Sequence, residues 1–429
     1  MTTRVATGLA LAALVGLSGC GIFKGAPKKT PTVGQRVPIL MSENQATVDK
    51  GLENVPVTLP VGVANDAWTQ PGGNAAKSMG SLLLASATPA KAWTAQINGG
   101  NNRARLAAGP VVAENKLFVV DVDAMLHAFA ADTGAKLWTR ALTETEENKS
   151  ARFGGGVSYD EGKLYATDGL GDVVAVNAAD GAVVWRAKPG GPLRGAPTVA
   201  NGQVYVLSQD NQIFALDQGD GKVVWTQSAS LETQGVFGVA APAASSGTVI
   251  AGFSSGELNA YRYENGRTLW QDALSRTSIT TSVSSLADID ADPVIDDGRV
   301  YSIGEGGRMV ALEIATGQRM WEQNLAGIST PWVAGEWIFL VTDDARLVCL
   351  SRAFKNEEKR NDPYNWFGPV LAGDKLWLTN SRGELVGASA TDGSVQTTIE
   401  AGDQFSMGPI IANQTLYTLD EKGVITAWR

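Results

Sequence analysis

The architecture of this chain follows from one repeated stretch, which reads Ala128-Phe129-Ala130-Ala131-Asp132-Thr133-Gly134-Ala135-Lys136-Leu137-Trp138. In this stretch an alanine precedes the glycine by six residues, and a tryptophan follows the glycine by four. The same spacing recurs at four later glycines, which are Gly181, Gly221, Gly266 and Gly317. A period of about 40–50 residues is typical of the blades of a β-propeller.

Each unit has the composition of an antiparallel meander. Its apolar runs, such as 116–120 and 204–207, are rich in Val, Leu and aromatic residues and are separated by turn residues. The repeated glycine closes a hairpin, where it accepts a positive φ without steric cost. The alanine lets sheets approach closely, and the tryptophan offers a large apolar surface for packing one blade on the next. Because a single blade cannot bury its own faces, we expect the units to close into a ring.

A second landmark gives the number of units. In seven units a proline begins the first predicted strand, where a missing backbone donor costs little: Pro110, Pro197, Pro242, Pro293, Pro331, Pro369 and Pro409. Val157 takes this place in the one other unit. The last unit ends at Arg429 without room for a fourth strand, whereas 92–97 resembles the fourth strand 137–142. The sequence therefore predicts an all-β, eight-bladed β-propeller of four-stranded antiparallel blades, closed by an N-terminal strand that completes the last blade.

Three stretches depart from the repeat. The sixth unit is charged over 351–365 and has no Gly-x-x-x-Trp, so we expect an irregular outer edge there. The seventh unit keeps Gly393 but has Thr397 in place of the tryptophan. An insertion over 274–291 makes the longest gap between landmarks. Long loops between blades are where binding functions concentrate, so this insertion is a candidate binding element.

The N-terminal residues 1–19 read as an export signal, with a positive charge at Arg4 followed by a short apolar stretch. The sequence Leu17-Ser18-Gly19-Cys20 resembles a bacterial lipobox, which predicts that Cys20 is acylated. Gly21 follows where an Asp commonly holds Gram-negative lipoproteins at the inner membrane, so the outer membrane is favoured. The sequence thus predicts lipidation at Cys20 as the membrane anchor.

Residues 20–60 contain several prolines between polar spacers and little periodicity, which predicts a flexible tether that follows the lipid anchor. Residues 61–429 are then expected to form the propeller. The polar and glycine-rich stretch 68–74 is expected to pack against the edge of the ring.

Few residues are suited to catalysis or metal binding. Net charge is −9 at pH 7 without a concentrated basic patch, which disfavours nucleic acid as a partner. The single histidine, His127, lies at a strand position that is mostly apolar in other units, so we interpret it as structural. Cys349 occupies the repeated alanine position and is expected to be buried. Asp288 and Asp290 alternate in an extended segment, so they face a partner or a cation, or they lie in a solvated loop. The further oxygen ligands of a calcium site are missing, and we expect neither metal nor cofactor.

The spaced Ala, Gly and Trp resemble the repeat of pyrroloquinoline-quinone-type propellers. Quinoprotein dehydrogenases with this repeat are longer, and many have an adjacent cysteine pair at the cofactor, a calcium site and a catalytic aspartate. This chain has neither a vicinal cysteine pair nor a Cys-x-x-Cys-His haem motif. The repeat is therefore present without that chemistry, since a fold does not imply a function.

The whole chain is more similar to the BamB family, the lipoproteins of the outer-membrane β-barrel assembly machinery. The likeness covers the lipobox, the tether, eight repeats and closure by the N-terminal strand. The stretch 286–294 is similar to that family's Leu-x-Asp-Val-Asp-x-x-Pro-Val segment, which implies that Asp288 and Asp290 dock the periplasmic repeats of BamA. A neighbouring family loop corresponds to 234–238, which keeps the apolar Val236 and Phe237 but lacks the family's arginine.

The resemblance implies a non-enzymatic scaffold at the periplasmic face of the outer membrane, bound to BamA and other components of the machinery. Unfolded outer-membrane proteins are further candidate clients, through exposed blade edges. Two alternatives stay open, a small enzyme like the quinoprotein dehydrogenases and an interaction ring for another envelope complex.

Overall fold

The structure is a computed structural model. It describes residues 55–101, 103–144, 148–193, 195–231, 240–274, 288–352, 356–359 and 364–429. The predicted leader, Cys20 and most of the predicted tether lie outside these residues. Within the described ranges no helix is long and apolar enough to cross a membrane.

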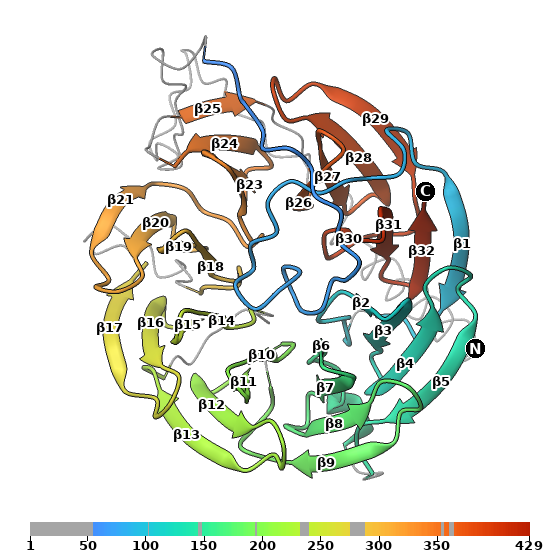
Figure 1. The fold of residues 1–429 in the computed structure, drawn as a ribbon, viewed down its shortest axis with the longest axis vertical. Coiled ribbons are helices and arrows are strands. Elements are labelled where there is room, and N and C mark those ends of the chain that lie inside the picture. Colours follow the sequence, from blue (N-terminus) through green and yellow to red (C-terminus); the bar gives the residue numbers. More distant parts are fainter. Residues whose placement is uncertain are drawn as a thin grey trace, which may run out of the picture. The chain divides into compact units, whose positions relative to one another are not determined.

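These residues form eight four-stranded antiparallel sheets, which lie as blades around a central axis (Figure 1). Apart from the 3₁₀ helix η1 (Lys149–Ala151), the described elements are strands. From the inner to the outer strand, the blades in chain order are β2 (Val111–Ala113), β3 (Lys116–Val120), β4 (Met125–Ala130), β5 (Lys136–Ala141); β6 (Val157–Asp160), β7 (Lys163–Thr167), β8 (Val173–Asn177), β9 (Val183–Ala187); β10 (Thr198–Ala200), β11 (Gln203–Leu207), β12 (Gln212–Asp217), β13 (Val223–Ser228); β14 (Ala243–Ser245), β15 (Thr248–Gly252), β16 (Glu257–Arg262), β17 (Thr268–Ala273); β18 (Val294–Asp296), β19 (Arg299–Gly304), β20 (Arg308–Glu313), β21 (Arg319–Gln323); β22 (Trp332–Ala334), β23 (Trp337–Val341), β24 (Leu347–Ser351), β25 (Asn356–Lys359); β26 (Trp366–Ala372), β27 (Lys375–Asn380), β28 (Glu384–Ser389), β29 (Val395–Glu400); and β30 (Ile410–Ala412), β31 (Thr415–Leu419), β32 (Val424–Trp428), β1 (Lys91–Gln96).

The predicted closure of the ring is confirmed. The N-terminal strand β1 pairs antiparallel with β32, with Ala95 opposite Ile425, and so supplies the outer strand of the eighth blade. Figure 1 shows β1 beside β32, near the C-terminal end of the chain. A ring closed in this way leaves no blade without a neighbour on either side.

The repeated glycine and tryptophan meet between neighbouring blades. A Cβ atom on Gly221 would lie 2.5 Å from Cε3 of Trp185, which belongs to the blade before it. The indole Nε1 of Trp185 donates a hydrogen bond to the carbonyl of Gln218 in the same turn, at 3.1 Å. Gly221 also has a positive φ of 74°. Glycine is therefore required at this turn both for the backbone conformation and for the room taken by the indole ring.

The sixth and seventh blades show what happens when this pair is missing. The outer strand β25 of the sixth blade has Glu357 opposite Cys349, where a regular blade has its tryptophan opposite an alanine. Cys349 is half-buried, so the prediction that it is buried was too strong. In the seventh blade a Cβ atom on Gly393 would meet nothing within 4 Å, because the blade before it supplies no tryptophan there.

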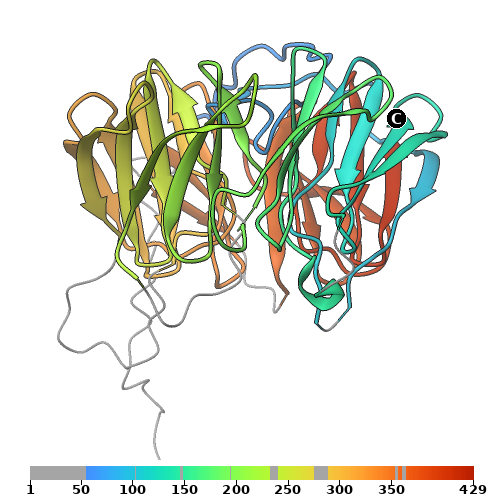
Figure 2. The ribbon, with the colours of Figure 1, turned by 90° about the horizontal axis from the view of Figure 1, so that it is seen from below.

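The ring has two different faces, which Figure 2 shows at the bottom and the top. We call the lower one the linker face, because it carries the linkers between successive blades and the turns between second and third strands. The upper one carries the other hairpin turns and the segment 57–85, which we call the strap. Residues 55–60 reach the ring on this strap face, where a Cβ atom on Gly335 would lie 3.2 Å from Pro60.

The strap crosses the central opening of the ring, which corrects the expectation that 68–74 packs against its edge (Figure 1). It bonds to the inner strand of every blade, because the inner strands expose unpaired backbone groups to the axis. In order from the first blade to the eighth, these bonds are Trp68 N to Val112 O, Tyr159 N to Thr69 O, Gln70 Nε2 to Val199 O, Ala244 N to Ala75 O, Ile295 N to Ala76 O, Trp332 Nε1 to Gly80 O, Leu82 N to Leu371 O, and Asn65 Nδ2 to Ile411 O.

Candidate docking site

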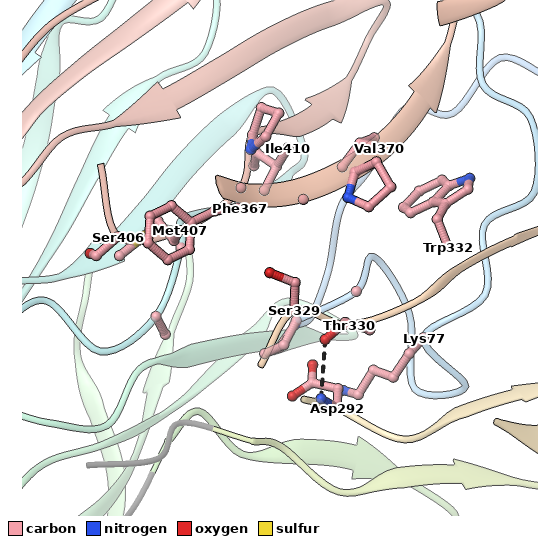
Figure 3. Close-up of a pocket in the computed structure, with 18 of the residues that line it drawn as sticks. Lys77, Asp292, Ser329, Thr330, Trp332, Phe367, Val370, Ser406, Met407 and Ile410 are labelled. Carbon is pink, nitrogen blue, oxygen red and sulfur yellow. Dashed lines mark hydrogen bonds between the residues drawn. The ribbon is translucent and has the colours of Figure 1, made fainter. Parts of the chain in front are cut away.

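A cavity of about 210 Å³ lies at the axis of the ring (Figure 3). Its wall is made by the linkers that lead into the first, fifth, sixth, seventh and eighth blades, including Asp290, Phe367 and Met407. Residues of the strap, among them Trp68 and Lys77, also line it. Since the linkers lie on one face and the strap on the other, the cavity belongs to the linker face and the strap is its floor.

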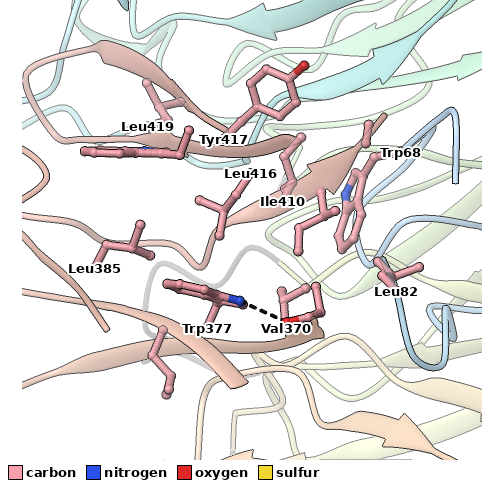
Figure 4. Close-up of a cluster of buried hydrophobic side chains, with 14 of the residues drawn as sticks. Trp68, Leu82, Val370, Trp377, Leu385, Ile410, Leu416, Tyr417 and Leu419 are labelled. Atoms are coloured by element: carbon pink, nitrogen blue, oxygen red, sulfur yellow. Dashed lines mark hydrogen bonds between the residues drawn. The ribbon is translucent and has the colours of Figure 1, made fainter. Parts of the chain in front are cut away.

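The floor is fixed by aromatic packing. Trp68 of the strap stacks on Trp332 of β22, with ring centroids 6.1 Å apart and an interplanar angle of 13°. Trp68 is 3% exposed and belongs to the largest apolar cluster, which continues through Leu82 into the seventh and eighth blades. Figure 4 shows Trp68 beside Ile410, with Leu82 close to Val370. The strap is therefore part of the core, and the cavity floor is preorganised.

Lys77 is the polar centre of this floor. Its side chain is buried, and its Nζ donates a hydrogen bond to Oγ1 of Thr198 in β10 at 3.0 Å. The Thr198 hydroxyl in turn donates to the carbonyl of Pro242, at the start of the fourth blade. Burial lowers the pKa of Lys77 to about 8, an effect that the nearby carboxylate of Asp292 opposes. Figure 3 shows the Lys77 side chain extending toward Asp292.

Asp292 joins three linkers. Its Oδ1 accepts a hydrogen bond from the backbone N–H of Ala241 at 2.7 Å, and its own N–H donates to Oγ1 of Thr330 at 3.1 Å. Burial raises the pKa of the Asp292 carboxyl, and the charge of Lys77 lowers it. The linkers that lead into the fourth, fifth and sixth blades are thus joined at the buried Asp292, whose carboxyl group is electrostatically coupled to Lys77.

The two predicted acidic residues differ in their surroundings. Asp288 is 0% exposed, and its carbonyl accepts a hydrogen bond from the N–H of Glu305 at 3.0 Å. Asp290 is 7% exposed and lines the cavity. Asp290 is thus the member of the pair that reaches the cavity wall. The predicted apolar contacts Val236 and Phe237 lie outside the described residues.

Further carboxylates surround Asp288 on the linker face. Glu305 lies in the turn between β19 and β20, and its pKa is raised to about 7 by burial and by the charges of Asp343 and Asp288. Asp343 lies in the corresponding turn of the sixth blade, and burial together with Asp344 raises its pKa to about 6. Two carboxyl groups on this side of the linker face thus have pKa values raised toward neutral pH.

His127 has the structural role that the sequence predicts. It is 6% exposed, with Nε2 at 2.9 Å from Oδ2 of Asp121 and Nδ1 at 3.0 Å from Oγ1 of Thr139. Both ring nitrogens are therefore used in linking β4 to its neighbouring turn and strand. Among the residues that the structure describes, no group of three or more His, Cys, Asp or Glu side chains is placed to hold a metal ion.

The cavity does not suit the quinone cofactor of the related dehydrogenases. Pyrroloquinoline quinone is a tricarboxylate, which cationic side chains would have to neutralise. Of the described residues that line the cavity, only Lys77 is cationic, and it shares the site with the carboxyl groups of Asp290 and Asp292. A further anionic group would thus be placed beside two acidic side chains.

Sequence reasoning missed the strap, Lys77 and Asp292. Asp292 continues the alternating spacing of Asp288 and Asp290, so this spacing could have identified it as a further site residue. Lys77 stands in a stretch of small residues outside the repeat, and no periodicity distinguishes it from a surface lysine. Its φ of 63° and its burial are visible only in the folded chain.

Solved structures with the same fold include two groups that bear on function. The solved structure of BamB from Moraxella catarrhalis matches with a TM-score of 0.69 at 18% identity, covering 80% of this chain and 99% of that one. Quinohemoprotein alcohol dehydrogenase from Comamonas testosteroni matches with a TM-score of 0.67 at 14% identity, covering 85% of this chain and 80% of that one. At these identities both likenesses show the fold alone.

The sequence comparisons separate the two groups. The family model described as outer membrane protein assembly factor BamB matches residues 78–149 and 123–361. The outer membrane protein assembly factor BamB of Salmonella typhimurium is 32% identical over 267 residues, which is 62% of this chain and 68% of that protein. Together with the eight blades and their closure by β1, these matches show that the chain belongs to the BamB family of outer membrane protein assembly factors.

Proposed function

We propose that this protein is a non-enzymatic scaffold of the outer-membrane protein assembly machinery, and that its linker face docks the periplasmic repeats of BamA. The observation that carries the proposal is the preorganised cavity on this face, with Asp290 in its wall. Family membership supports the same role. A rigid surface with a central pocket loses little conformational entropy on binding and offers a place for a few dominant contacts.

In this proposal Asp290, Val236 and Phe237 contact BamA directly. Asp288 is buried and contributes to docking indirectly. Its charge acts on the partner through space, and its carbonyl accepts a hydrogen bond from the N–H of Glu305. The segment 232–239, which holds Val236 and Phe237, begins after the exposed Leu231 and ends before the buried Ala240. Ala241, which follows this segment, is bound by the carboxylate of Asp292, and Asp292 lines the cavity.

The protein is anchored, in the same proposal, by a lipid on Cys20 at the periplasmic face of the outer membrane. The tether is the part of residues 20–60 that precedes the strap, and it keeps the ring at a high local concentration beside the machinery. Since residues 55–60 reach the ring on the strap face, the linker face stays accessible to BamA. Outer blade edges are the proposed sites for unfolded clients, and the exposed Val184 and Val224 on β9 and β13 are suitable positions for crosslinking probes.

Binding of the full chain, purified in detergent, to the purified periplasmic repeats of BamA from the same source tests the docking role. We expect Asp290→Asn to weaken binding by about tenfold, or ~1.4 kcal/mol. Glu336→Gln is the matched control, because it removes the same charge from an exposed turn on the strap face. If the unchanged protein does not bind the repeats even at low salt, the docking role is contradicted. If Asp290→Asn binds as tightly as Glu336→Gln, the contact with BamA does not involve Asp290.

The enzyme alternative is tested on the same preparation. A small quinoprotein would show the absorption of a bound quinone and would reduce an artificial dye in the presence of an alcohol. We expect neither signal, because the cavity holds two acidic side chains and one buried lysine where an anionic cofactor would need cations. Affinity isolation from solubilised membranes distinguishes BamA from another envelope partner.

A further inference from the structure

The strap is continuous with the candidate docking site. Three consecutive strap residues contact the chain just beyond Asp290. The carbonyl of Ala76 accepts a hydrogen bond from the N–H of Ile295 at 2.8 Å, and the hydroxyl of Ser78 donates to Oδ1 of Asp296 at 2.7 Å. Between them lies Lys77, whose charge is coupled to that of Asp292. The strap is therefore held against β18, the strand that directly follows the linker 288–292, over successive residues.

Lys77 is placed there against a conformational cost. It has a φ of 63°, a left-handed conformation that residues other than glycine adopt only at a conformational cost. The turn before it is tight, since a Cβ atom on Gly72 would lie 2.8 Å from Cβ of Lys77. The N–H of Lys77 donates to the carbonyl of Asn74 at 3.1 Å, which fixes this turn. A strained backbone conformation of this kind persists only where many surrounding contacts hold it in place. Here it places the ammonium group toward Thr198 in the interior.

We propose that Lys77 is a positioning residue for docking, through which the strap holds the linker 288–292 and the start of the fourth blade in the conformation that binds the partner. This inference rests on the proposed function of the linker face. Lys77 bonds to Thr198, which bonds to Pro242, while its carboxylate neighbour Asp292 holds Ala241. The linker that carries Asp290 and the start of the fourth blade are thus both connected to Lys77, the first through Asp292 and the second through Thr198.

Most of the strap precedes the part of the chain that the family model matches, which begins at residue 78. Lys77 lies directly before the first matched residue. Removal of the ammonium group would leave the buried Asp292 carboxylate without its cation, so that it must take up a proton or move toward water. Protonation would weaken the acceptor of the Ala241 N–H, and movement toward water would displace the linker that carries Asp290.

A comparison of two strap variants tests this role. Lys77→Met keeps the length and apolar character of the stem but removes the charge. Gln70→Met is the matched control, because Gln70 is also buried and makes two bonds to Val199 of the third blade, with Nε2 to O and N to Oε1 both at 2.9 Å. Both changes remove a strap contact, but only the first is coupled to Asp292.

We expect Lys77→Met to weaken binding of the purified BamA periplasmic repeats by about tenfold. In the free protein, deuterium exchange at the amides of Ala241 and of 288–292 should accelerate by a similar factor. Gln70→Met should lower the urea midpoint comparably but leave the affinity within about twofold of the unchanged protein. The double variant Lys77→Met with Asp292→Asn should regain part of the affinity, since no unpaired charge remains.

Three results would overturn the proposal: unchanged affinity and exchange in Lys77→Met, equal loss of affinity in both strap variants, or no recovery in the double variant. If the unchanged protein does not bind the repeats at all, the docking role fails. The exchange measurement on the free protein then still shows whether Lys77 holds the linker.

Discussion

The carboxylate of Asp292 accepts a hydrogen bond from the backbone N–H of Ala241 at 2.7 Å, although the two residues lie in linkers that enter different blades. Asp292→Ala would leave this buried N–H without an acceptor and the Lys77 ammonium without its carboxylate neighbour. We expect a loss of about 2–4 kcal/mol in the free energy of unfolding, measured by urea denaturation. Asp132→Ala is the control, because that side chain is exposed and the same turn position is alanine in two other blades, at Ala179 and Ala315, so it should change stability by less than about 0.5 kcal/mol. A loss no larger than in the control would contradict this account.

The contact of glycine with tryptophan between blades is tested by two alanine substitutions. Gly221→Ala should cost about 2–4 kcal/mol, because the left-handed backbone disfavours a Cβ atom and that atom would overlap Trp185. Gly393→Ala has the same sign of φ, 67°, but an open surrounding, so we expect only about 1 kcal/mol. Urea unfolding of both variants gives the difference, and equal losses would mean that the backbone alone requires glycine.

We expect the strap to stabilise the ring as well as to form the floor of the cavity. Trp68→Ala removes a side chain that is 3% exposed and stacked on Trp332, so we expect a loss of about 3–5 kcal/mol. Deuterium exchange should rise at Val112, whose N–H donates to the carbonyl of Trp68 at 2.8 Å. Leu137→Ala, at a side chain that is 47% exposed, is the control and should leave both measurements unchanged. Slow exchange at Val112 in Trp68→Ala would show that the strap stays bound without its indole.

The raised pKa of Glu305 predicts a dependence of stability on pH. Its pKa is about 7 in the folded protein, above 4.5, so between these values the folded chain holds a proton that the unfolded chain has lost. The stability from this group is therefore full below about pH 4.5 and falls as the pH rises through about 7. Glu305→Gln should thus gain more stability, relative to the unchanged protein, at pH 8 than at pH 5. Since Glu305 is half-buried and solvent screens it, we expect a difference of about 1–2 kcal/mol.

Urea unfolding of the Glu305→Gln variant and of the unchanged protein at the two pH values gives this difference. Glu336→Gln, on the exposed turn of the opposite face, controls for the change in net charge. An equal effect of Glu305→Gln at pH 5 and pH 8 would show that burial does not hold the proton on this carboxyl group.

The sequence by itself determined the ring. The spacing of Ala128, Gly134 and Trp138 and its copies predicts eight blades, and the likeness of 92–97 to 137–142 predicts the closing strand. Both depend on local periodicity, which any chain folded into stacked blades must repeat, because each blade buries the same faces. The departure at 351–365 likewise predicted that the sixth blade lacks its tryptophan contact.

Only the tertiary structure decided what lies at the axis. The strap has no period of its own, and its bonds join residues that are far apart in the chain, as between Gln70 and Val199. Lys77 became a buried charge and Asp288 a buried carboxylate because the strap and the linkers cover them, not because of their neighbours in sequence. A sequence repeat specifies the features that every blade shares. The strap at the centre of the ring contacts all eight blades but is not itself repeated, so its place could not be predicted from the repeat.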